Sequence, residues 1–569
     1  MGPNLLKAFK IIFIFSLLVL GLYSSVITGF SWDEYFHHIN GNVRFQFYAT
    51  LGAVDRLDFR NIEFYPGFYD TLSYSISHII FLINRNFFIN NLAEIMHFIN
   101  FSFASLSILG LYLISKKFFN QSIALFACLL TLLNPFFFGH MGINSKDIII
   151  FFSFIWFSYF FYKYLIEENG RIKNLLLASF FIGFGCGVRL TFPIVILPVV
   201  IVGLFYLFFE YNSKYWALSK RLISHSLIAI FIIILITLMC WPHMIIEIQK
   251  GNFVNFFSKI VAKTLSWLDG PKIGLINGEW YEVFNTPKTY FLDILKYRMP
   301  FYSTLLALMS LVLIFKRDLQ IKRDISNFNL KFIILLFITI FPIIIAISMD
   351  VNIYDNIRLF LFVVPIYCLV SSIALEHLFL QFKKTWTAKI STIIVLILFS
   401  LSFYRFLYLT PYQYSYVNYS YPKYKDSLGK FELDYWGASY KELVKEIKKN
   451  HTKEEIAHFK IHDCGGGDYT LTYYLNKYLG INKTFSDEKL KDATHVVMNN
   501  RAFLDVTYNE YVKDLVDEKG VMFESDMIEV VRAPEIKQLC FDYKLFQGEE
   551  TAIISRGNLP LTIFRKLNR

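Results

Sequence analysis

Long apolar segments recur along most of this chain, and they constrain its fold more than any other feature. The first begins near the N-terminus, where Lys7 and Lys10 precede a run of apolar residues that ends near residue 29. An α-helix needs about twenty such residues to cross the hydrocarbon core of a bilayer. The run is too long for the core of a signal peptide and has no small-residue cleavage pattern, so we expect an uncleaved first span.

Further apolar runs follow and predict a polytopic α-helical membrane protein with about eleven transmembrane helices. They lie near residues 93–114, 121–138, 147–166, 174–188, 192–209, 222–241, 300–315, 331–348, 357–375 and 389–408. The composition agrees, because 55% of the 569 residues are hydrophobic and only 18% are charged. A soluble chain could not hide that much apolar surface, so we expect much of it to face lipid.

Basic residues between the spans predict the orientation of the chain. When the spans alternate across the membrane, these residues all fall on the same side as Lys7 and Lys10. They are Lys116, Lys117, Arg171, Lys173, Lys214, Lys220, Arg221, Lys316, Arg317, Lys322, Arg323, Lys383, Lys384 and Lys389. The positive-inside rule makes this side cytoplasmic, and it accounts for a net charge of +11 without nucleic acid as a partner.

The opposite face carries the first loop (31–91), the long loop (243–298), short turns such as "GHMGINSKD" and "MDVNIYDNIR", and everything after Thr410. We therefore expect an integral protein, typical of a bacterial inner membrane, with a cytoplasmic N-terminus and an extracytoplasmic active site. Residues 1–410 are predicted to form the transmembrane domain, with a structured first loop because "YPGFYDTLSYSISHIIFLI" has helical periodicity.

The last segment, 411–569, changes character and predicts a small soluble α/β domain outside the membrane. "SYKELVKEIKKN" has helical charge patterning, "HDCGGGDYT" contains a Gly-rich turn, and "THVVMNN" and "MIEVVRAP" are typical of short strands. Cys464 and Cys540 are the two cysteines of this segment, and a disulfide between them or two free thiols are both open.

Acidic residues stand at two outer ends of spans. "SWDEYFHH" places Asp33 and Glu34 where the first span leaves the membrane, and Asp147 closes the short turn "GHMGINSKD". The alternatives are an acidic pair that ends a helix in water and an Asp147 that caps the next helix. As a group, the three carboxylates are candidate catalytic residues.

Three short outer turns each carry a cation: Lys146, Arg189 in "GVRLTFP" and Arg358 in "YDNIRLF". The positive-inside rule disfavours cations on this face, whereas Arg is suited to holding a phosphate. Snorkelling toward lipid headgroups is the alternative for each of them. Carboxylates and cations beside a membrane suit sugar transfer from a lipid-linked phosphate, since one group deprotonates the acceptor hydroxyl and the others neutralise the departing phosphate.

The chain resembles the glycosyltransferase-C superfamily, especially the protein O-mannosyltransferases and the lipid A aminoarabinose transferase. The resemblance rests on the "DE" after the first span, the "YPGFYD" helix, the "NSKD" turn, the span pattern and "GEWYEVFNTPKTYFLDILKYRMP" in the long loop. It implies an inverting transfer from a polyprenyl-phosphate sugar to a glycan, lipid or protein acceptor in contact with membrane lipid. Asp33 would be the base, and Asp147 would match the acidic residue of the second loop.

Two features depart from that family. Ser145 stands where bacterial relatives have Pro in "NPKD", and "FELDYWGASYKE" has no counterpart that we can assign. Asp434 and Trp436 of this second segment are candidates for lining an acceptor groove, with a buried structural role as the alternative. The identity of the acceptor therefore stays open.

A divalent metal is not established by the sequence. Asp33, Glu34, His37, His38 and Asp147 offer oxygen and nitrogen ligands, so a metal stays an open alternative. The two histidines are adjacent, and on a helix their rings would diverge by about 100°. They would rarely bind one ion together.

Two other functional classes compete with the glycosyltransferase interpretation. A secondary transporter predicts paired repeats, broken helices and ionisable groups near the bilayer midplane, whereas the notable charges here cluster at outer span ends. A non-catalytic membrane scaffold would explain the C-terminal domain but leaves the acidic first loop without a task.

Overall fold

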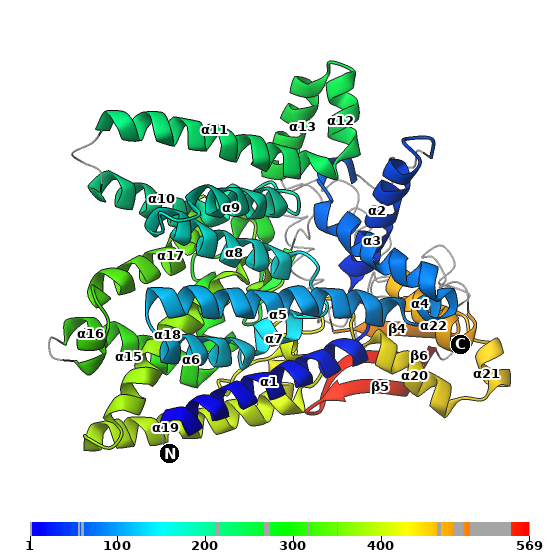
Figure 1. Cartoon of the computed structure of the whole chain (residues 1–569). Helices are drawn as coiled ribbons and strands as arrows, with labels where there is room; N and C mark the ends of the chain where they lie inside the picture. Colours follow the sequence, from blue (N-terminus) through cyan, green and yellow to red (C-terminus); the bar gives the residue numbers. More distant parts are fainter. Residues whose placement is uncertain are drawn as a thin grey trace.

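Long helices lie side by side and form the larger part of the protein (Figure 1). The computed structural model describes residues 3–54, 57, 62–210, 215–266, 273–316, 319–349, 351–463, 468–481, 493–500 and 548–567. The C-terminal strands and short helices lie together at one end of the helical bundle. The predicted fold, a helical membrane protein with a small C-terminal α/β part, is confirmed.

Seven described helices are long and apolar enough to cross a bilayer. They are α1 (Pro3–Ile27), α5 (Leu92–Phe118), α8 (Asp147–Ile166), α10 (Phe192–Glu210), α17 (Phe328–Ser348), α18 (Val363–Gln381) and α19 (Trp386–Tyr408). Large apolar side chains stay exposed on them, such as Phe15 and Leu396. This pattern is expected where the solvent is lipid.

The count of eleven spans is too high for the described residues, which give seven, or nine if each of two bent helix pairs is one span. One pair is α11 (Tyr215–Met239) with α12 (Pro242–Gln249), bent by 106°. The other joins α14 (Tyr290–Asp293) and η3 (Ile294–Arg298) to α15 (Phe301–Phe315), bent by 118°. In both pairs a proline begins or directly precedes the second helix, where the missing N–H is tolerated.

The remaining two apolar runs form helices that are short for a membrane span. They are α6 (Gln121–Leu132) and α9 (Arg171–Cys186). The chain breaks after α6 because the Asn134 Oδ1 atom accepts hydrogen bonds from the amides of Phe136 and Phe137, which starts the separate helix α7 (Pro135–His140).

The first loop folds into helices held together by a buried arginine. The helices are α2 (Trp32–Ala49), η1 (Ile62–Phe64), α3 (Phe68–Ile83) and α4 (Arg85–Asn90). Arg44 in α2 donates hydrogen bonds to the carbonyl oxygens of Ile62, Tyr65, Pro66 and Cys240. One guanidinium therefore ties α2 to the segment that leads into α3 and to the end of α11.

The long loop contains α13 (Phe253–Ser266), a β-hairpin and a short helical turn, η2 (Val283–Asn285). The hairpin pairs β1 (Ile273–Ile276) with β2 (Glu279–Glu282). Asn277 and Gly278 both have positive φ, 51° and 86°, as a two-residue type I′ turn requires. Ile276 also forms a bridge to Phe431, which brings the hairpin against the C-terminal segment.

In the described part of the C-terminal segment, four strands form a mixed sheet with helices beside it. The strands are β3 (Ile461–Asp463), β4 (His495–Asn499), β5 (Gly548–Arg556) and β6 (Leu559–Leu567), in the order β3-β4-β6-β5. The helical elements are η5 (Gln413–Ser415), η6 (Tyr424–Ser427), α20 (Tyr440–Asn450), α21 (Lys453–Ala457) and α22 (Asp468–Leu479). Strands β3 and β4 are parallel, and β6 is antiparallel to β4 and β5. The predicted strand in "MIEVVRAP" and both Cys464 and Cys540 lie outside the described residues.

Polar contacts fix this segment to the ends of α1 and α5. The Lys441 Nζ atom donates to the carbonyl oxygen of Val26 at 2.7 Å and pairs with Glu94 at 2.9 Å. The Phe30 amide donates to the Tyr474 hydroxyl at 2.7 Å. The segment is therefore docked against the same end of the bundle that carries the first loop.

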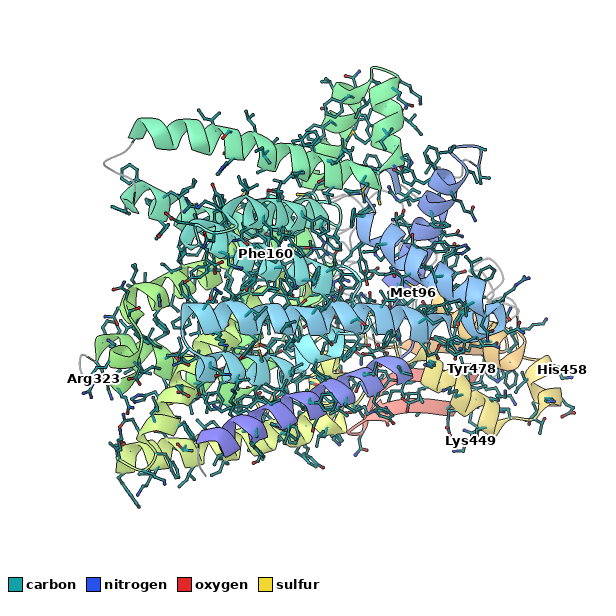
Figure 2. The ribbon with its side chains drawn as sticks, in the orientation of Figure 1. Met96, Phe160, Arg323, Lys449, His458 and Tyr478 are labelled. Atoms are coloured by element: carbon teal, nitrogen blue, oxygen red, sulfur yellow. The ribbon has the colours of Figure 1, made fainter. Side chains whose placement is uncertain are left out.

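A predicted inner loop and the C-terminal segment lie at opposite ends of the bundle. Arg323 in α16 (Gln320–Asp324) lies at one end, among the predicted inner loops, while Lys449, His458 and Tyr478 lie at the opposite end (Figure 2). The first loop and the C-terminal segment lie at this second end (Figure 1). The predicted outer turns that carry Asp147 and Arg358 reach Asp33 of the first loop through ion pairs.

Candidate active site

Arg358 is the centre of a charged cluster built from segments far apart in the sequence. It begins η4 (Arg358–Phe360) and contacts three carboxylates. Its Nη1 atom lies 3.2 Å from Asp33 Oδ2, its Nη2 atom 3.2 Å from Asp355 Oδ2, and its Nε atom 3.9 Å from Asp147 Oδ2. Burial alone would lower the pKa of Arg358, but Asp355, Tyr354 and Asp33 raise it above its ordinary value, so the guanidinium stays charged.

Asp147 joins Arg358 to the second arginine of the cluster. Its Oδ1 atom lies 2.8 Å from Arg189 Nη2. Its Oδ2 atom accepts a hydrogen bond of 2.9 Å from Asn144, and its own amide donates to Asn144 Oδ1 at 2.7 Å. The "NSKD" turn is thus closed on itself at the start of α8. This geometry fixes the carboxylate toward the two guanidinium groups.

Lys146 lies beside the cluster without an ion pair among the described residues. Its ammonium group lies 4.9 Å from the centre of the Tyr65 ring, a cation–π distance. Its charge is nevertheless one of those that lower the pKa of Asp33. The ammonium is therefore a cation near the cluster that is not already neutralised by a carboxylate contact.

Asp33 and Glu34 have different environments although they are adjacent on α2. The Asp33 side chain is 44% exposed and touches the cluster through one oxygen. Glu34 is fully buried, and its Oε2 atom accepts a hydrogen bond of 2.8 Å from the Ser31 amide and lies 3.1 Å from His97 Nε2. The structure therefore brings Asp33, but not Glu34, to the cluster.

The Glu34 contacts form a capping box, in which Ser31 and Glu34 each bind the backbone of the other. The signal was present in the sequence, because "SWDE" has the Ser-x-x-Glu spacing of this motif. These contacts stabilise the first turn of α2. We therefore propose a structural role for Glu34 in place of the predicted catalytic one.

The charges of the cluster set the protonation state of Asp33. Burial would raise the pKa of this carboxyl, but the charges of Arg358, Lys146, His37 and Arg189 together lower it below its ordinary value. Asp33 is therefore an ionised carboxylate at neutral pH, as a group that accepts a proton must be.

Trp436 and Asp434, the two candidates for lining an acceptor groove, have different environments in the structure. The Trp436 ring lies 4.9 Å from the Arg358 guanidinium, and the Trp436 carbonyl accepts a hydrogen bond of 3.2 Å from the Trp32 amide. Trp436 thus packs against the charged cluster. Asp434 has no exposed surface, and its carboxylate accepts hydrogen bonds from Tyr414, Ala438 and Ser439.

The buried Asp434 carboxylate therefore stabilises the turn that follows it, through the hydrogen bonds that it accepts from Ala438 and Ser439. Burial raises the pKa of its carboxyl, although the hydrogen bonds from Ser439 and Tyr414 oppose the rise. Its oxygens are directed at neighbouring protein groups and away from solvent. We propose a structural role for Asp434 and retain only Trp436 near the site.

Sequence reasoning missed two acidic members of this region, Asp355 and Asp70. Asp355 precedes Arg358 by three residues, and both Asp355 and Asn356 adopt positive φ, 54° and 63°. This tight turn folds the carboxylate back onto the guanidinium. Asp70 in α3 lies 2.9 Å from His37 Nδ1. The spacing "YDNIR" could have indicated the first, but the second depends on how α2 and α3 pack.

His37 and His38, which could offer nitrogen ligands to a metal, have different partners in the structure. His37 contacts Asp70, whereas the His38 ring packs 5.2 Å from the Tyr74 ring and 6.3 Å from the Phe88 ring. Within the described ranges, no group of three or more His, Cys, Asp or Glu side chains could hold a metal ion. The carboxylates of Asp33 and Asp147 contact arginines instead.

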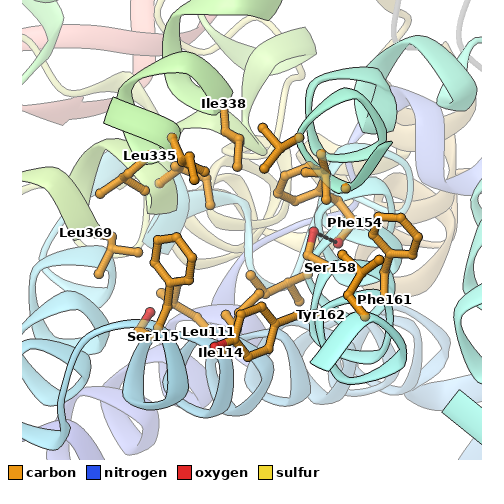
Figure 3. A pocket seen from close by; sticks show the side chains of 18 residues that line it. Leu111, Ile114, Ser115, Phe154, Ser158, Phe161, Tyr162, Leu335, Ile338 and Leu369 are labelled. Atoms are coloured by element: carbon orange, nitrogen blue, oxygen red, sulfur yellow. Dashed lines mark hydrogen bonds between the residues drawn. The ribbon is translucent and has the colours of Figure 1, made fainter. Parts of the chain in front are cut away.

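An apolar pocket of about 110 Å³ lies within the helical bundle (Figure 3). Its lining comes from α5, α8, α10, α17 and α18 and includes Leu111, Phe154, Ser158, Phe161, Gly203, Ile338 and Leu369. Along α8, with a rise of 1.5 Å per residue, it extends from about 10 to 27 Å beyond Asp147. Apolar cavities of about 150 Å³ stay dry and take up small hydrocarbons, so this pocket suits a segment of a lipid chain.

One part of the chain matches a known family. Residues 78–241 match the family model described as dolichyl-phosphate-mannose-protein mannosyltransferase. This stretch is less than a third of the chain, and it contains Lys146, Asp147 and Arg189 but neither Asp33 nor Arg358. The match confirms the predicted resemblance to the glycosyltransferase-C superfamily.

Solved structures with a similar arrangement include ArnT from Cupriavidus metallidurans in the apo state, with 11% identity, 98% coverage of both chains and a TM-score of 0.49. The same protein bound to undecaprenyl phosphate gives 10% identity, the same coverage and a TM-score of 0.48. The oligosaccharyltransferase AglB from Archaeoglobus fulgidus has 14% identity over 90% of this chain and 72% of its own, with a TM-score of 0.46. A comparison with curated proteins finds no significant match.

Proposed function

We propose that this chain, whose residues 78–241 match a mannosyltransferase family, is an inverting glycosyltransferase that takes its sugar from a polyprenyl-phosphate donor. The observation that carries the proposal is the half-exposed, ionised carboxylate of Asp33 in contact with the buried Arg358 guanidinium. A proton acceptor and a phosphate-binding cation thereby lie side by side at the outer end of a membrane bundle.

In the proposed reaction, Asp33 accepts the proton of an acceptor hydroxyl. The resulting oxygen attacks the anomeric carbon of the donor and forms the new glycosidic bond. The bond from that carbon to the phosphate oxygen breaks, and its electron pair leaves with the polyprenyl phosphate. The negative charge on this leaving group would be stabilised by Arg358, Arg189 and Lys146. Arg is especially suited to this role because one guanidinium can bind two phosphate oxygens at once.

Arg358 contacts Asp33 directly, and this contact bears on the proposed mechanism. A donor phosphate that binds Arg358 would compete for the same Nη atoms. As the contact weakens, the pKa of Asp33 would rise toward its ordinary value, and its carboxylate would become a stronger base. Donor binding would thus prepare Asp33 for proton transfer.

Lipid chains of the donor would extend from the charged cluster into the bundle. We propose the apolar pocket of Figure 3 for one segment of that chain, because its walls are apolar and it lies along α8 beyond Asp147. No polar headgroup could be satisfied there, since the described lining offers few hydrogen-bonding groups.

Filling this pocket should weaken binding of long-chain donors selectively. Ser158→Phe places a ring in the space, so we expect KM for a long-chain polyprenyl-phosphate sugar to rise about tenfold, which corresponds to about 1.4 kcal/mol. KM for a short-chain donor that ends above the pocket should stay within twofold. Leu197→Phe, at a 39% exposed position of α10, is the matched control. Equal effects on both donor lengths would contradict the assignment.

The proposed orientation places the C-terminal segment outside the cytoplasm. In a variant without Cys464 and Cys540, Lys449→Cys should label with a membrane-impermeant thiol reagent in intact cells, since the Lys449 side chain is 75% exposed. Arg323→Cys, at the opposite end (Figure 2), should label only after permeabilisation. The reverse pattern would overturn the orientation.

A transfer assay tests the proposed function itself. The purified protein, in lipid nanodiscs, is incubated with radiolabelled polyprenyl-phosphate sugars, and both sugar transfer and release of polyprenyl phosphate are followed. We expect release that depends on Asp33. Uptake of a solute into proteoliposomes, with no donor cleavage, would instead favour the secondary transporter.

A further inference from the structure

A stripe of polar side chains follows one face of α2 away from the site. Asp33, His37, Asn40 and Arg44 succeed one another at spacings of four, three and four, the helical spacing that usually carries apolar side chains. Three of them, His37, Asn40 and Arg44, are buried. A buried polar stripe is costly unless its members are hydrogen-bonded, so each of its polar atoms needs a partner.

The partners can be followed from the far end of the stripe. Arg44 Nε donates to Asn40 Oδ1 at 2.8 Å. Because this contact fixes which end of the Asn40 amide is the oxygen, the Nδ2 atom lies at the end directed away from Arg44. That nitrogen donates to Asp70 Oδ2 at 2.5 Å, and His37 Nδ1 lies 2.9 Å from the same oxygen. The network therefore runs from Arg44 through Asn40 and Asp70 to His37.

This order determines where the proton of the His37 ring lies. An ionised carboxylate can only accept hydrogen bonds, so Nδ1 must carry the proton that faces Asp70. Burial would raise the pKa of Asp70, but His37, Lys146 and Asn40 lower it below its ordinary value, which keeps it ionised. The other ring nitrogen, Nε2, is then left to hydrogen-bond a ligand, as an acceptor in the neutral ring and as a donor in the protonated ring.

His37 Nε2 is the one ring atom of this network that lacks a hydrogen-bond partner among the described residues. The His37 side chain is only 4% exposed, so water in bulk does not replace the missing partner. His37 lies one helical turn from Asp33, and residues with this spacing have Cβ atoms about 5–6 Å apart. A ring nitrogen without a hydrogen-bond partner among the described residues thus lies close to the Asp33 carboxylate.

We propose that His37 is a substrate-binding residue whose Nε2 atom forms a hydrogen bond with a sugar hydroxyl, with Asp70 as the positioning residue that holds the ring through Nδ1. The inference rests on the proposed function, because it requires a polyhydroxylated substrate at Asp33. The hydroxyl could belong to the donor sugar or to a sugar acceptor, since both present the same O–H group. A site built to bind a hydroxyl discriminates against an analogue that lacks it.

Deoxy analogues test this assignment. The probes are dolichyl-phosphate mannose as donor and methyl mannoside as acceptor. Each is compared with analogues that lack one hydroxyl group. Binding of the donor is also measured in the absence of turnover. For the wild type, we expect one deoxy analogue to have an affinity and a transfer rate at least tenfold lower than those of its parent compound. His37→Ala should reduce that difference to about twofold or less, and the substrate involved identifies the partner of His37.

Two further variants separate binding from folding. Asp70→Asn should reduce the same discrimination, because an amide no longer enforces the Nδ1 proton. His38→Ala, which alters the adjacent histidine packed on Tyr74 and Phe88, should leave the discrimination as in the wild type. If folded His37→Ala keeps the full deoxy penalty for both substrates, the inference is wrong while the proposed function stands. If the wild type shows no sugar transfer that depends on Asp33, both the inference and the proposed function are wrong.

Discussion

Replacing Asp33 with Asn should lower kcat for sugar transfer by about a hundredfold to ten-thousandfold, the usual contribution of a positioned general base. The substitution keeps the shape of the side chain and removes its basicity. Asp33 is 44% exposed, so the loss of its contact with Arg358 should cost the fold little. The measurement is single-turnover transfer from a radiolabelled donor, with donor affinity determined separately. We expect affinity for the donor to be retained or increased, because Arg358 loses a competing carboxylate.

Glu34→Gln is the matched control for this variant. Its carboxylate closes the capping box of α2 and contacts His97, so the change should cost stability, about 1 kcal/mol for a lost cap, with turnover per folded molecule largely kept. Normal turnover in folded Asp33→Asn together with loss of turnover in folded Glu34→Gln would reassign the base to Glu34. Normal turnover in both would contradict the proposed chemistry.

Replacing Arg358 with Ala should abolish donor binding and also destabilise the protein. The change leaves the buried carboxylates of Asp355 and Asp147 without one of their cations, and removal of one partner of a buried ion pair typically costs about 3–5 kcal/mol. Thermal unfolding in detergent measures this loss, and titration with polyprenyl phosphate measures donor affinity. Unchanged donor affinity in the folded fraction would remove Arg358 from the phosphate site.

Arg358→Lys distinguishes charge from geometry. It keeps the positive charge but cannot hold three carboxylates or two phosphate oxygens in a fixed fork, so donor affinity should fall while the fold is largely kept. The contact with Asp33 should also weaken, which raises the pKa of that carboxyl toward its ordinary value. Since the base must be ionised, the acid limb of kcat/KM should move to higher pH. Arg189→Ala, at a side chain 21% exposed with Asp147 as its partner, should have a smaller effect on both properties.

Hydropathy alone predicted every long helix of the bundle, because a helix in lipid must be apolar along its whole length. The alternation of spans also predicted that Asp33, Asp147, Arg189 and Arg358 share one face, and the structure brings these four together. The number of spans was less predictable. The break at Asn134 depends on a local side-chain cap, which an average over a window of residues does not detect.

Roles of buried polar residues were the least predictable part. Glu34 and Asp434 stood in suggestive motifs, but their oxygens accept hydrogen bonds from neighbouring protein groups. A metal near His37 was left open by the sequence, whereas the partner of this ring in the structure is Asp70 from the next helix. Such pairings depend on how two elements pack, and no pattern within one segment specifies them. The capping box of α2 differs, because the Ser-x-x-Glu spacing of "SWDE" lies within one segment.

The most direct test of the proposed site is a structure of the protein in nanodiscs with bound polyprenyl phosphate. We predict phosphate density within hydrogen-bonding distance of the Arg358 guanidinium, with the Asp33 carboxylate facing the same space and the lipid chain continuing toward the apolar pocket along α8. Phosphate density away from Arg358, Arg189 and Lys146, with the contact between Arg358 and Asp33 unchanged, would contradict the account.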